Sequence, residues 1–223
     1  SNFDYLKESI KTEVLNLGFS HIGYCSPKQI SDFDVYLDWV NNGFSADMDY
    51  LKRKDVLEKR KDPRKVMESV QTIMVLAMPY VPPLPLENSN HKPILSSYAY
   101  GRDYHNVIPD QLKNFAIWLE RKIKPFALEY RIYTDTGPIL ERSLAVGSGL
   151  GWIGKNSCLI IPGQGSFFFL AEIFLNLEFS FDRPYTLDLC GNCHKCLDHC
   201  PTGCILSNRT IDASKCISYL TIE

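Results

Sequence analysis

Thr-Ile-Met-Val-Leu-Ala-Met, residues 72–78, is the stretch that decides the fold, because it is a nearly unbroken apolar run. Runs of this length and composition are typical of strands that are buried on both faces of a sheet. Pro82, Pro83 and Pro85 follow closely, and proline cannot donate the backbone hydrogen bond that a central strand needs. We therefore expect a central strand at residues 72–78 and a loop at residues 81–93.

The residues before this strand predict two helices separated by a strand. Apolar residues at helical spacing predict a helix over residues 3–17, and a short strand over residues 21–25 follows. A second helix is expected to begin after Ser31 or Asp32, either of which can cap it, and to end at Gly43. The pattern therefore predicts both helices and strands from the start of the chain.

The residues after the central strand continue this alternation. Proline in a first helical turn and glycine-rich turns between apolar runs mark the boundaries. The expected elements are a strand over 94–100, a helix over 106–124, a strand over 129–133, a helix over 138–146 beginning near Pro138, and strands over 158–161 and 167–174 joined as a hairpin by residues 162–165.

These elements predict an α+β fold: a layered, mixed α/β domain followed by a small ferredoxin-like domain. From Asp182 onward the chain becomes dense in Cys, Gly, Pro and Asp and loses its apolar periodicity, which marks a boundary near residue 180. We therefore expect one domain at residues 1–180 and a second at residues 181–223.

The composition bounds the class of partner. With 223 residues, of which 45% are hydrophobic and 22% charged, the chain can bury one sizeable core. A formal net charge of -2 excludes a uniformly basic nucleic-acid-binding protein. Residues 52–65 nevertheless hold eight Lys and Arg against three acidic residues. This segment is either a local nucleic-acid contact or a solvated helical face.

The sequence predicts a cytoplasmic protein. It has no run of 18 apolar residues, and its first residues, Ser1 to Asp4, lack the charged and apolar regions of a secretory signal. Six of the eight cysteines fall between Cys190 and Cys216, where a reducing compartment would leave them free to bind metal.

The cysteine spacing predicts iron–sulfur clusters. Cys190, Cys193, Cys196 and Cys200, followed by proline, form the bacterial ferredoxin run, in which three thiolates hold one cluster and the fourth ligates another. Cys204 and Cys216 remain outside this run, and no second run is completed before the chain stops. The ligand set is therefore incomplete, and we expect a chain truncated at its C-terminus.

Zinc is the alternative for this segment. Zinc sites need four ligands and usually come from two separated cysteine pairs or a Cys/His mixture, which three thiols at uninterrupted spacing fit poorly. His194 and His199 are expected to face solvent or to donate hydrogen bonds to sulfur. Cys25 and Cys158 are expected to be small buried apolar residues without a chemical role.

Residues 149–154 match the dinucleotide-binding pattern G-x-G-x-x-G, and with Lys155 they match most of a P-loop. In both motifs a strand enters and a helix leaves, whereas here a helix is expected to enter and a strand to leave. A P-loop also needs Ser or Thr where Asn156 stands. Two interpretations of the glycines remain. They allow the backbone to approach a large flat ligand closely, with Trp152, Lys155 and Asn156 at its rim, or they form a helix end and a tight turn.

Asp135 lies at the predicted end of a strand, just before a helix. Strand ends are where α/β folds place catalytic groups, but an aspartate in this position is equally often a helix cap. Both interpretations stay open on this evidence.

Four separated motifs in this order resemble the epoxyqueuosine reductase family. They are DTGPILER at 135–142, GLGWIGKN at 149–156, the cysteine–proline run, and CISYLTIE at 216–223. YAYGRDYH at 98–105 and EKR at 58–60 are weaker matches. The resemblance covers most of the chain.

The resemblance implies an enzyme that reduces epoxyqueuosine to queuosine at the wobble position of a tRNA anticodon loop. It implies cobalamin and two 4Fe-4S clusters as cofactors, with electrons passing from the clusters to cobalt. The implied partners are the tRNA anticodon stem-loop and an external electron donor, with no membrane, and the protein is expected to be a monomer. Residues 1–180 would then be the cobalamin-binding catalytic domain.

By the same resemblance Asp135 is the catalytic proton donor, and burial beside an apolar corrin would raise its pKa. Cys190, Cys193 and Cys196 are expected to ligate one cluster, and Cys200 and Cys216 the other. The residues expected to contact cobalamin are Arg60, Tyr98, Asp135, Trp152, Gly154, Lys155, Asn156, Ser157, Ser218, Tyr219 and Leu220.

Two other functions remain as alternatives. A dehalogenase-like reductase would share the cofactors but act on a small organohalide. A ferredoxin-type electron carrier, or a zinc-binding interaction protein, would take up no corrin.

Overall fold

A four-stranded antiparallel sheet forms the centre of the molecule. The computed structural model describes residues 2–28, 30, 32–80 and 96–222. The strands lie in the order β1 (His21–Cys25), β2 (Thr72–Pro79), β6 (Phe168–Leu175) and β3 (Tyr130–Tyr133). The central strand expected at residues 72–78 is confirmed: β2 pairs with β1 on one side and with β6 on the other.

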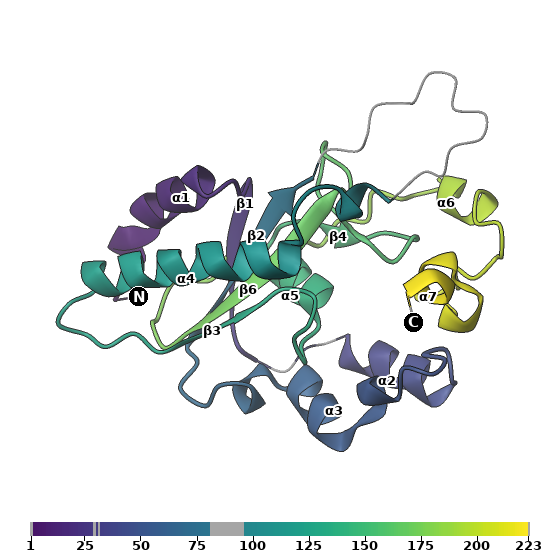
Figure 1. The fold of residues 1–223 in the computed structure, drawn as a ribbon, viewed down its shortest axis with the longest axis horizontal. Coiled ribbons are helices and arrows are strands. Elements are labelled where there is room, and N and C mark those ends of the chain that lie inside the picture. The colour runs from purple at the N-terminus through teal and green to yellow at the C-terminus, as the bar shows by residue number, and fades with distance from the viewer. Residues whose placement is uncertain (1, 29, 31, 81–95, 223) are drawn as a thin grey trace.

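Helices cover both faces of this sheet (Figure 1). Along β2, Met74 and Leu76 pack on one face against α1 (Lys7–Asn16) and α4 (Tyr104–Lys122). Ile73, Val75 and Ala77 pack on the other face, against α5 (Glu141–Gly147). Because successive side chains of a strand alternate between faces, burial on both sides accounts for the unbroken apolar run.

Shorter elements surround the sheet. The remaining helices are α2 (Phe33–Asn41), α3 (Lys54–Lys61), α6 (Lys195–Asp198) and α7 (Ile217–Ile222). A separate two-stranded sheet joins β4 (Trp152–Ile153) to β5 (Leu159–Ile160). Short 3₁₀ helices lie at Asp4–Leu6, Asp49–Lys52, Pro63–Lys65, Ser97–Ala99 and Ala213–Lys215.

The C-terminal segment contains little regular structure and is fastened to the sheet domain by hydrogen bonds. The backbone N–H of Tyr24 in β1 donates to Oδ2 of Asp182 at 2.8 Å. The indole N–H of Trp39 in α2 donates to the carbonyl of Ile211 at 2.6 Å, and the N–H of Ala213 donates to the carbonyl of Phe44. The segment therefore lies against α2 and β1. The domain boundary near residue 180 stays a prediction.

The expected hairpin between residues 158–161 and 167–174 is wrong. A turn does form there, with a bridge between Ile161 and Gly165, but β5 pairs with β4 and not with β6. The physical reason is that both edges of β6 are already occupied, one by β2 and the other by β3.

Two further boundaries differ from expectation. The helix expected from Pro138 begins at Glu141, because residues 134–140 form an irregular turn instead. Of the strand expected at 94–100, the described part contains the 3₁₀ helix Ser97–Ala99, so that prediction is wrong there. The loop expected at 81–93 lies outside the described residues.

Candidate active site

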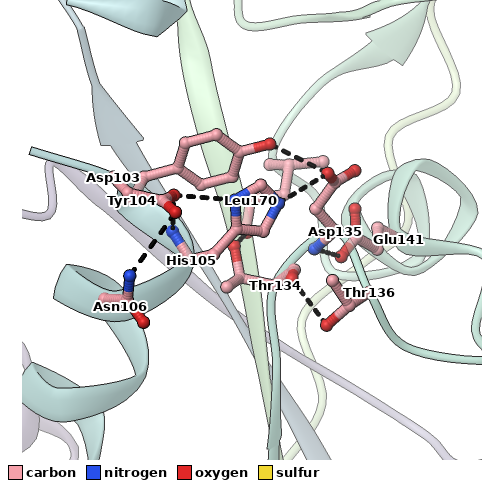
Figure 2. A network of polar contacts seen from close by, with 9 residues as sticks. All are labelled: Asp103, Tyr104, His105, Asn106, Thr134, Asp135, Thr136, Glu141 and Leu170. Carbon is pink, nitrogen blue, oxygen red and sulfur yellow. Dashed lines mark hydrogen bonds and ion pairs between the residues drawn. The ribbon is translucent and has the colours of Figure 1, made fainter. Parts of the chain in front are cut away.

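Asp135 lies two residues beyond the end of β3, in a turn that holds it in a left-handed backbone conformation with φ of 60°. Aspartate is one of the few residues besides glycine that adopt this conformation, at a modest energetic cost. Its backbone N–H donates to Oε1 of Glu141 at 2.5 Å, a bond that closes the turn (Figure 2). This bond also explains why α5 begins at Glu141, three residues later than expected.

The Asp135 carboxylate is held from α4. Its Oδ2 accepts a hydrogen bond from the hydroxyl of Tyr104 at 2.8 Å and lies 3.0 Å from Nε2 of His105 (Figure 2). The side chain is nevertheless 59% exposed. The expected burial of Asp135 is burial against a bound corrin, so it stays a prediction. The turn projects it past the end of the strand into contact with the start of α4.

His105 connects two carboxylates. Its Nδ1 lies 2.8 Å from Oδ1 of Asp103, the N-cap of α4, and its Nε2 contacts Asp135. Partial burial works to lower the pKa of His105, but the hydrogen bonds to Asp135 and Asp103 outweigh it, so the pKa is raised. Burial, followed by the bond to Asp135, raises the pKa of Tyr104 well above its usual range. The imidazole of His105 and the hydroxyl of Tyr104 therefore both face the Asp135 carboxyl group.

Sequence reasoning assigned no role to Tyr104 or His105. They end the stretch YAYGRDYH, which was noted only as a weak match. One feature of the sequence could have pointed to them. A helix-capping aspartate, Asp103, is followed at once by two aromatic residues that can form hydrogen bonds. Nothing in the sequence indicated that this helix start would meet the turn after β3.

Two arginines lie behind the turn. Nη1 of Arg60 donates to the carbonyl of Ile139 at 3.0 Å, and its guanidinium lies over the ring of Tyr36, 5.0 Å from the centroid. In the described part of the chain Nε of Arg60 is buried and has no hydrogen-bond partner. Arg142 donates through Nη1 to Oγ of Ser157 at 2.8 Å and also to the carbonyl of that residue. Arg60 and Ser157 are thereby linked to the turn that carries Asp135.

The loop after β4 reaches the cysteine segment. The indole N–H of Trp152 donates to Sγ of Cys190 at 3.4 Å. Nζ of Lys155 donates to the carbonyls of Gly191 and Cys193, at 2.7 and 2.9 Å. The first turn of the cysteine motif is thus held by two residues that were expected to lie at the rim of a ligand.

The glycines of this loop are required by contacts within the chain. A Cβ on Gly151 would lie 2.0 Å from the carbonyl oxygen of Ile160, and a Cβ on Gly154 would lie 2.4 Å from the Ile160 side chain. Gly149, with φ of 82°, follows the end of α5. A helix does enter this stretch and a strand does leave it, as expected from the reversed motif order. Of the two interpretations, the helix end and tight turn accounts for the glycines without any ligand.

Four cysteines line one cavity of about 250 Å³ in the C-terminal segment: Cys196, Cys200, Cys204 and Cys216. The thiol sulfurs of Cys200 and Cys204 lie 3.5 Å apart. A hydrogen bond with Thr202 lowers the pKa of Cys200 to about 6, which favours the thiolate, the form that ligates metals. This set of sulfur donors fits an iron–sulfur cluster. In the described residues, however, the side chains are not drawn together into a metal-binding group of three or more.

The other expected site residues fall in separate places. In α7 the hydroxyl of Tyr219 donates to Oδ2 of Asp47 at 3.2 Å. Among the described residues, none of the α7 hydrogen bonds reaches Asp135. Ser218, Leu220 and Tyr98 are exposed, and Cys25 is buried as expected. Cys158 is exposed, so its expected burial is wrong.

The basic segment at residues 52–65 is partly neutralised. Lys52, Arg53 and Arg64 each pair with a neighbouring aspartate, at 2.7 to 2.9 Å. The remaining exposed cations include Lys54, Lys61 and Lys65. Within the residues that the structure describes, no helix is both long and apolar enough to cross a membrane.

The fold and the cysteine spacing together define a class: an iron–sulfur protein with a mixed α/β domain followed by a cysteine-rich module. Two family descriptions match the sequence. "Epoxyqueuosine reductase QueG, DUF1730" covers residues 60–136, and "4Fe-4S double cluster binding domain" covers residues 189–223. A curated epoxyqueuosine reductase from Cyclobacterium marinum is 40% identical over 215 residues, which make up 96% of this chain and 68% of that protein. The chain belongs to the epoxyqueuosine reductase family.

Solved structures agree with this assignment. The epoxyqueuosine reductase of Streptococcus thermophilus matches with a TM-score of 0.86 and 30% identity, over 98% of this chain and 58% of that one. An epoxyqueuosine reductase bound to an epoxyqueuosine-modified tRNA-Tyr stem loop matches with a TM-score of 0.85 and 28% identity, over 97% of this chain and 57% of that one. The Bacillus subtilis enzyme, described with its catalytic aspartate loop swung out of the active site, matches with a TM-score of 0.84 and 27% identity, again over 97% and 57%. The chain thus spans less than two thirds of each solved relative.

Proposed function

We propose that this chain forms the catalytic and part of the cluster-binding region of an enzyme that reduces epoxyqueuosine to queuosine in the anticodon loop of tRNA. The observation that carries the proposal is the arrangement around Asp135. An exposed carboxylate at a strand end is held by Tyr104 and His105, and Glu141 accepts the backbone N–H of the same residue. Support comes from the solved relative that binds an epoxyqueuosine-modified stem loop.

Cobalamin is the proposed cofactor of this site. The residues fit a large ligand that carries hydrogen-bond acceptors, because Nε of Arg60 is buried without a partner among the described residues. Tyr98 is exposed and Trp152 is half-buried, so both could offer aromatic surface to an apolar ring system. Arg60, Tyr98, the loop 152–157 and residues 218–220 are the proposed contacts. When bound, cobalamin would supply a low-valent, nucleophilic metal as the reductant of the epoxide.

The residues of the chain would supply the proton and its positioning. Asp135 would deliver a proton to the departing epoxide oxygen, and His105 and Tyr104 are placed to hold the carboxyl group and to replace that proton. Deoxygenation removes one oxygen as water and consumes two electrons and two protons. The clusters would pass the electrons inward, and the contact of Trp152 with Cys190 offers a short connection between the two regions.

The remaining proposals concern partners and location. The tRNA anticodon stem-loop is the proposed substrate, and an external donor would reduce the clusters ligated by Cys190, Cys193 and Cys196 and by Cys200 and Cys216. A monomer in the cytoplasm follows from the family resemblance. A dehalogenase-like reductase and a plain electron carrier are disfavoured, because curated relatives with 34 to 40% identity over most of the chain are named epoxyqueuosine reductase.

The test is Asp135→Asn in the full-length protein, purified without oxygen. Asparagine keeps the size of the side chain but cannot donate a proton as an acid, so we expect turnover to fall by a factor of at least about 100. Cobalamin binding, followed by the corrin absorption spectrum, is expected to stay intact. Turnover close to that of the unmodified protein would contradict the assignment, and loss of cobalamin binding would mean that Asp135 has a structural role.

A further inference from the structure

A second carboxyl group, Glu172, lies buried in the sheet behind the Asp135 turn. It occupies the middle of β6, opposite Val75 of β2 and Tyr133 of β3, and its side chain is fully buried. Within the described residues neither of its carboxylate oxygens accepts a hydrogen bond from a donor group. A buried carboxylate without a partner is so unfavourable that the group keeps its proton instead.

Glu141 is the titratable group that interacts electrostatically with Glu172, and it also binds Asp135. Oε1 of Glu141 accepts the backbone N–H of Asp135 at 2.5 Å. Burial raises the pKa of Glu141 to about 7, and it raises that of Glu172 well above its ordinary value, with the facing Glu141 carboxyl adding to the shift. Glu141 therefore stands between a buried acid and the turn that holds Asp135.

The charged and titratable groups around the pair come from several elements. Arg60 of α3 and Arg142 of α5 favour a negative charge on Glu141, whereas Asp135 disfavours it. Tyr104 of α4 interacts electrostatically with Glu141, and Cys25 of β1 with Glu172. The cations lie on the Glu141 side, so a single negative charge on the pair is placed best on Glu141.

The number of protons on the pair follows from these contacts. With no proton, two facing carboxylates would repel each other inside the sheet domain. With two protons, the N–H of Asp135 would bind a neutral acceptor, which is a weaker bond than one to a carboxylate. With one proton, Glu172 can donate to Glu141 while the Glu141 carboxylate accepts the N–H of Asp135.

We propose that Glu141 and Glu172 share one proton, and that the pair is a positioning device that keeps the backbone of Asp135 in its left-handed conformation. The proton resides on Glu172 and is directed at Glu141. The consequence for catalysis rests on the proposed function of Asp135, but the proton and the backbone contact can be measured without any turnover.

The first experiment locates the proton by infrared spectroscopy at pH 8. We expect the unmodified protein to show the carbonyl stretch of a protonated carboxyl group, and Glu172→Gln to lose it. Glu178→Gln is the matched control, because Glu178 is exposed and lies six residues further along the same segment. A spectrum without this band, or a band that survives in Glu172→Gln, overturns the proposal.

The second experiment measures hydrogen exchange of the Asp135 amide by nuclear magnetic resonance. Glu141→Ala removes the acceptor, so we expect exchange to become about tenfold faster, as for the loss of one hydrogen bond to a charged group. After correction for intrinsic exchange, protection in the unmodified protein should increase between pH 6 and pH 8, as Glu141 becomes a carboxylate.

Glu141→Gln keeps an acceptor oxygen without titrating and should abolish that pH dependence, so the test holds even if Glu141→Ala fails to fold. Unchanged exchange in folded Glu141→Ala, or pH dependence retained in Glu141→Gln, overturns the proposal. Neither result bears on whether Asp135 is the proton donor. Conversely, an inactive protein would leave these two measurements valid.

Discussion

At the scale of single residues, the site consists of one carboxylate and the groups that hold it. Asp135 contacts side chains from α4 and, through its backbone, a side chain from α5. These partners lie 30 and 31 residues before it and 6 residues after it, so the turn is fixed from two directions. The exposure of the carboxylate leaves it accessible to a substrate from outside the sheet domain.

Tyr104→Phe tests the hold on the Asp135 carboxylate. The change removes only the hydroxyl that donates to Oδ2 of Asp135, while the ring can keep its stacking on Phe169. A hydrogen bond to a charged group contributes about 2 kcal/mol, so we expect kcat to fall roughly thirtyfold with KM unchanged. Steady-state kinetics of the full-length enzyme would measure this. Tyr5→Phe, at a position that is 71% exposed, is the control and should leave both constants unaltered.

Glu172→Gln tests the electrostatic cost of the buried pair through the stability of the protein. Burial raises the folded-state pKa of Glu141 to about 7 and that of Glu172 well above its ordinary value, so their protonated forms favour folding at low pH. The contribution of Glu141 is lost as pH rises through about 7. For Glu141 alone this amounts to about 3 kcal/mol in the free energy of unfolding between pH 4 and pH 9.

Urea unfolding at pH 5 and pH 9 measures this loss. Glu172→Gln should lose less than half as much stability as the unmodified protein over that interval, because its amide does not ionise and it no longer repels the Glu141 carboxylate. Glu178→Gln should behave like the unmodified protein. Equal pH dependence of the unfolding free energy in all three proteins would show that ionisation of Glu172 does not destabilise the fold.

At the scale of elements, the sequence predicted what local pattern determines. The apolar run of β2, the strand at residues 21–25 and the helices α1, α2 and α4 are where periodicity placed them, within a few residues at their ends. Periodicity and capping residues report burial and local hydrogen bonding, and both are properties of short segments. The structure of these elements is determined mainly by residues close in sequence.

The errors arose where a distant partner decides the structure. Strand β5 was assigned to β6 because a turn joins them, but strand pairing depends on which sheet edges are free, and that is a property of the whole sheet. The start of α5 was placed at Pro138, whereas a side chain at Glu141 closes the preceding turn. Likewise, Asp135 could be singled out, but its contacts with Tyr104 and His105 depend on how α4 meets the end of β3.

Gly151→Ala tests the packing of β4 on β5. The added Cβ would lie 2.0 Å from the carbonyl oxygen of Ile160, a backbone atom that cannot rotate away. We expect the free energy of unfolding to fall by about 3 kcal/mol or more. Gly163→Ala is the control: a Cβ there meets nothing within 4 Å, so only its left-handed conformation, with φ of 73°, should cost about 1 kcal/mol. Equal losses of unfolding free energy in the two variants would mean that the backbone at Ile160 moves to accommodate a side chain at position 151.

At the scale of the whole molecule, the sheet domain and the cysteine segment are in contact through hydrogen bonds. Asp135 and its partners lie at one end of the sheet, and the loop after β4 links that domain to Cys190 and Cys193. The C-terminal segment is fastened separately to α2 and β1. Such an arrangement suits an enzyme in which electrons enter through one module and are used in another.

The most direct test of this account is a single-turnover reaction of the full-length protein with reduced clusters and an anticodon stem-loop that carries epoxyqueuosine. The product nucleoside is identified by mass spectrometry, with and without cobalamin. The account predicts loss of one oxygen, giving queuosine, only when the clusters and cobalamin are both present. Conversion without cobalamin, or no conversion by a fully loaded protein that binds the stem-loop, would contradict it.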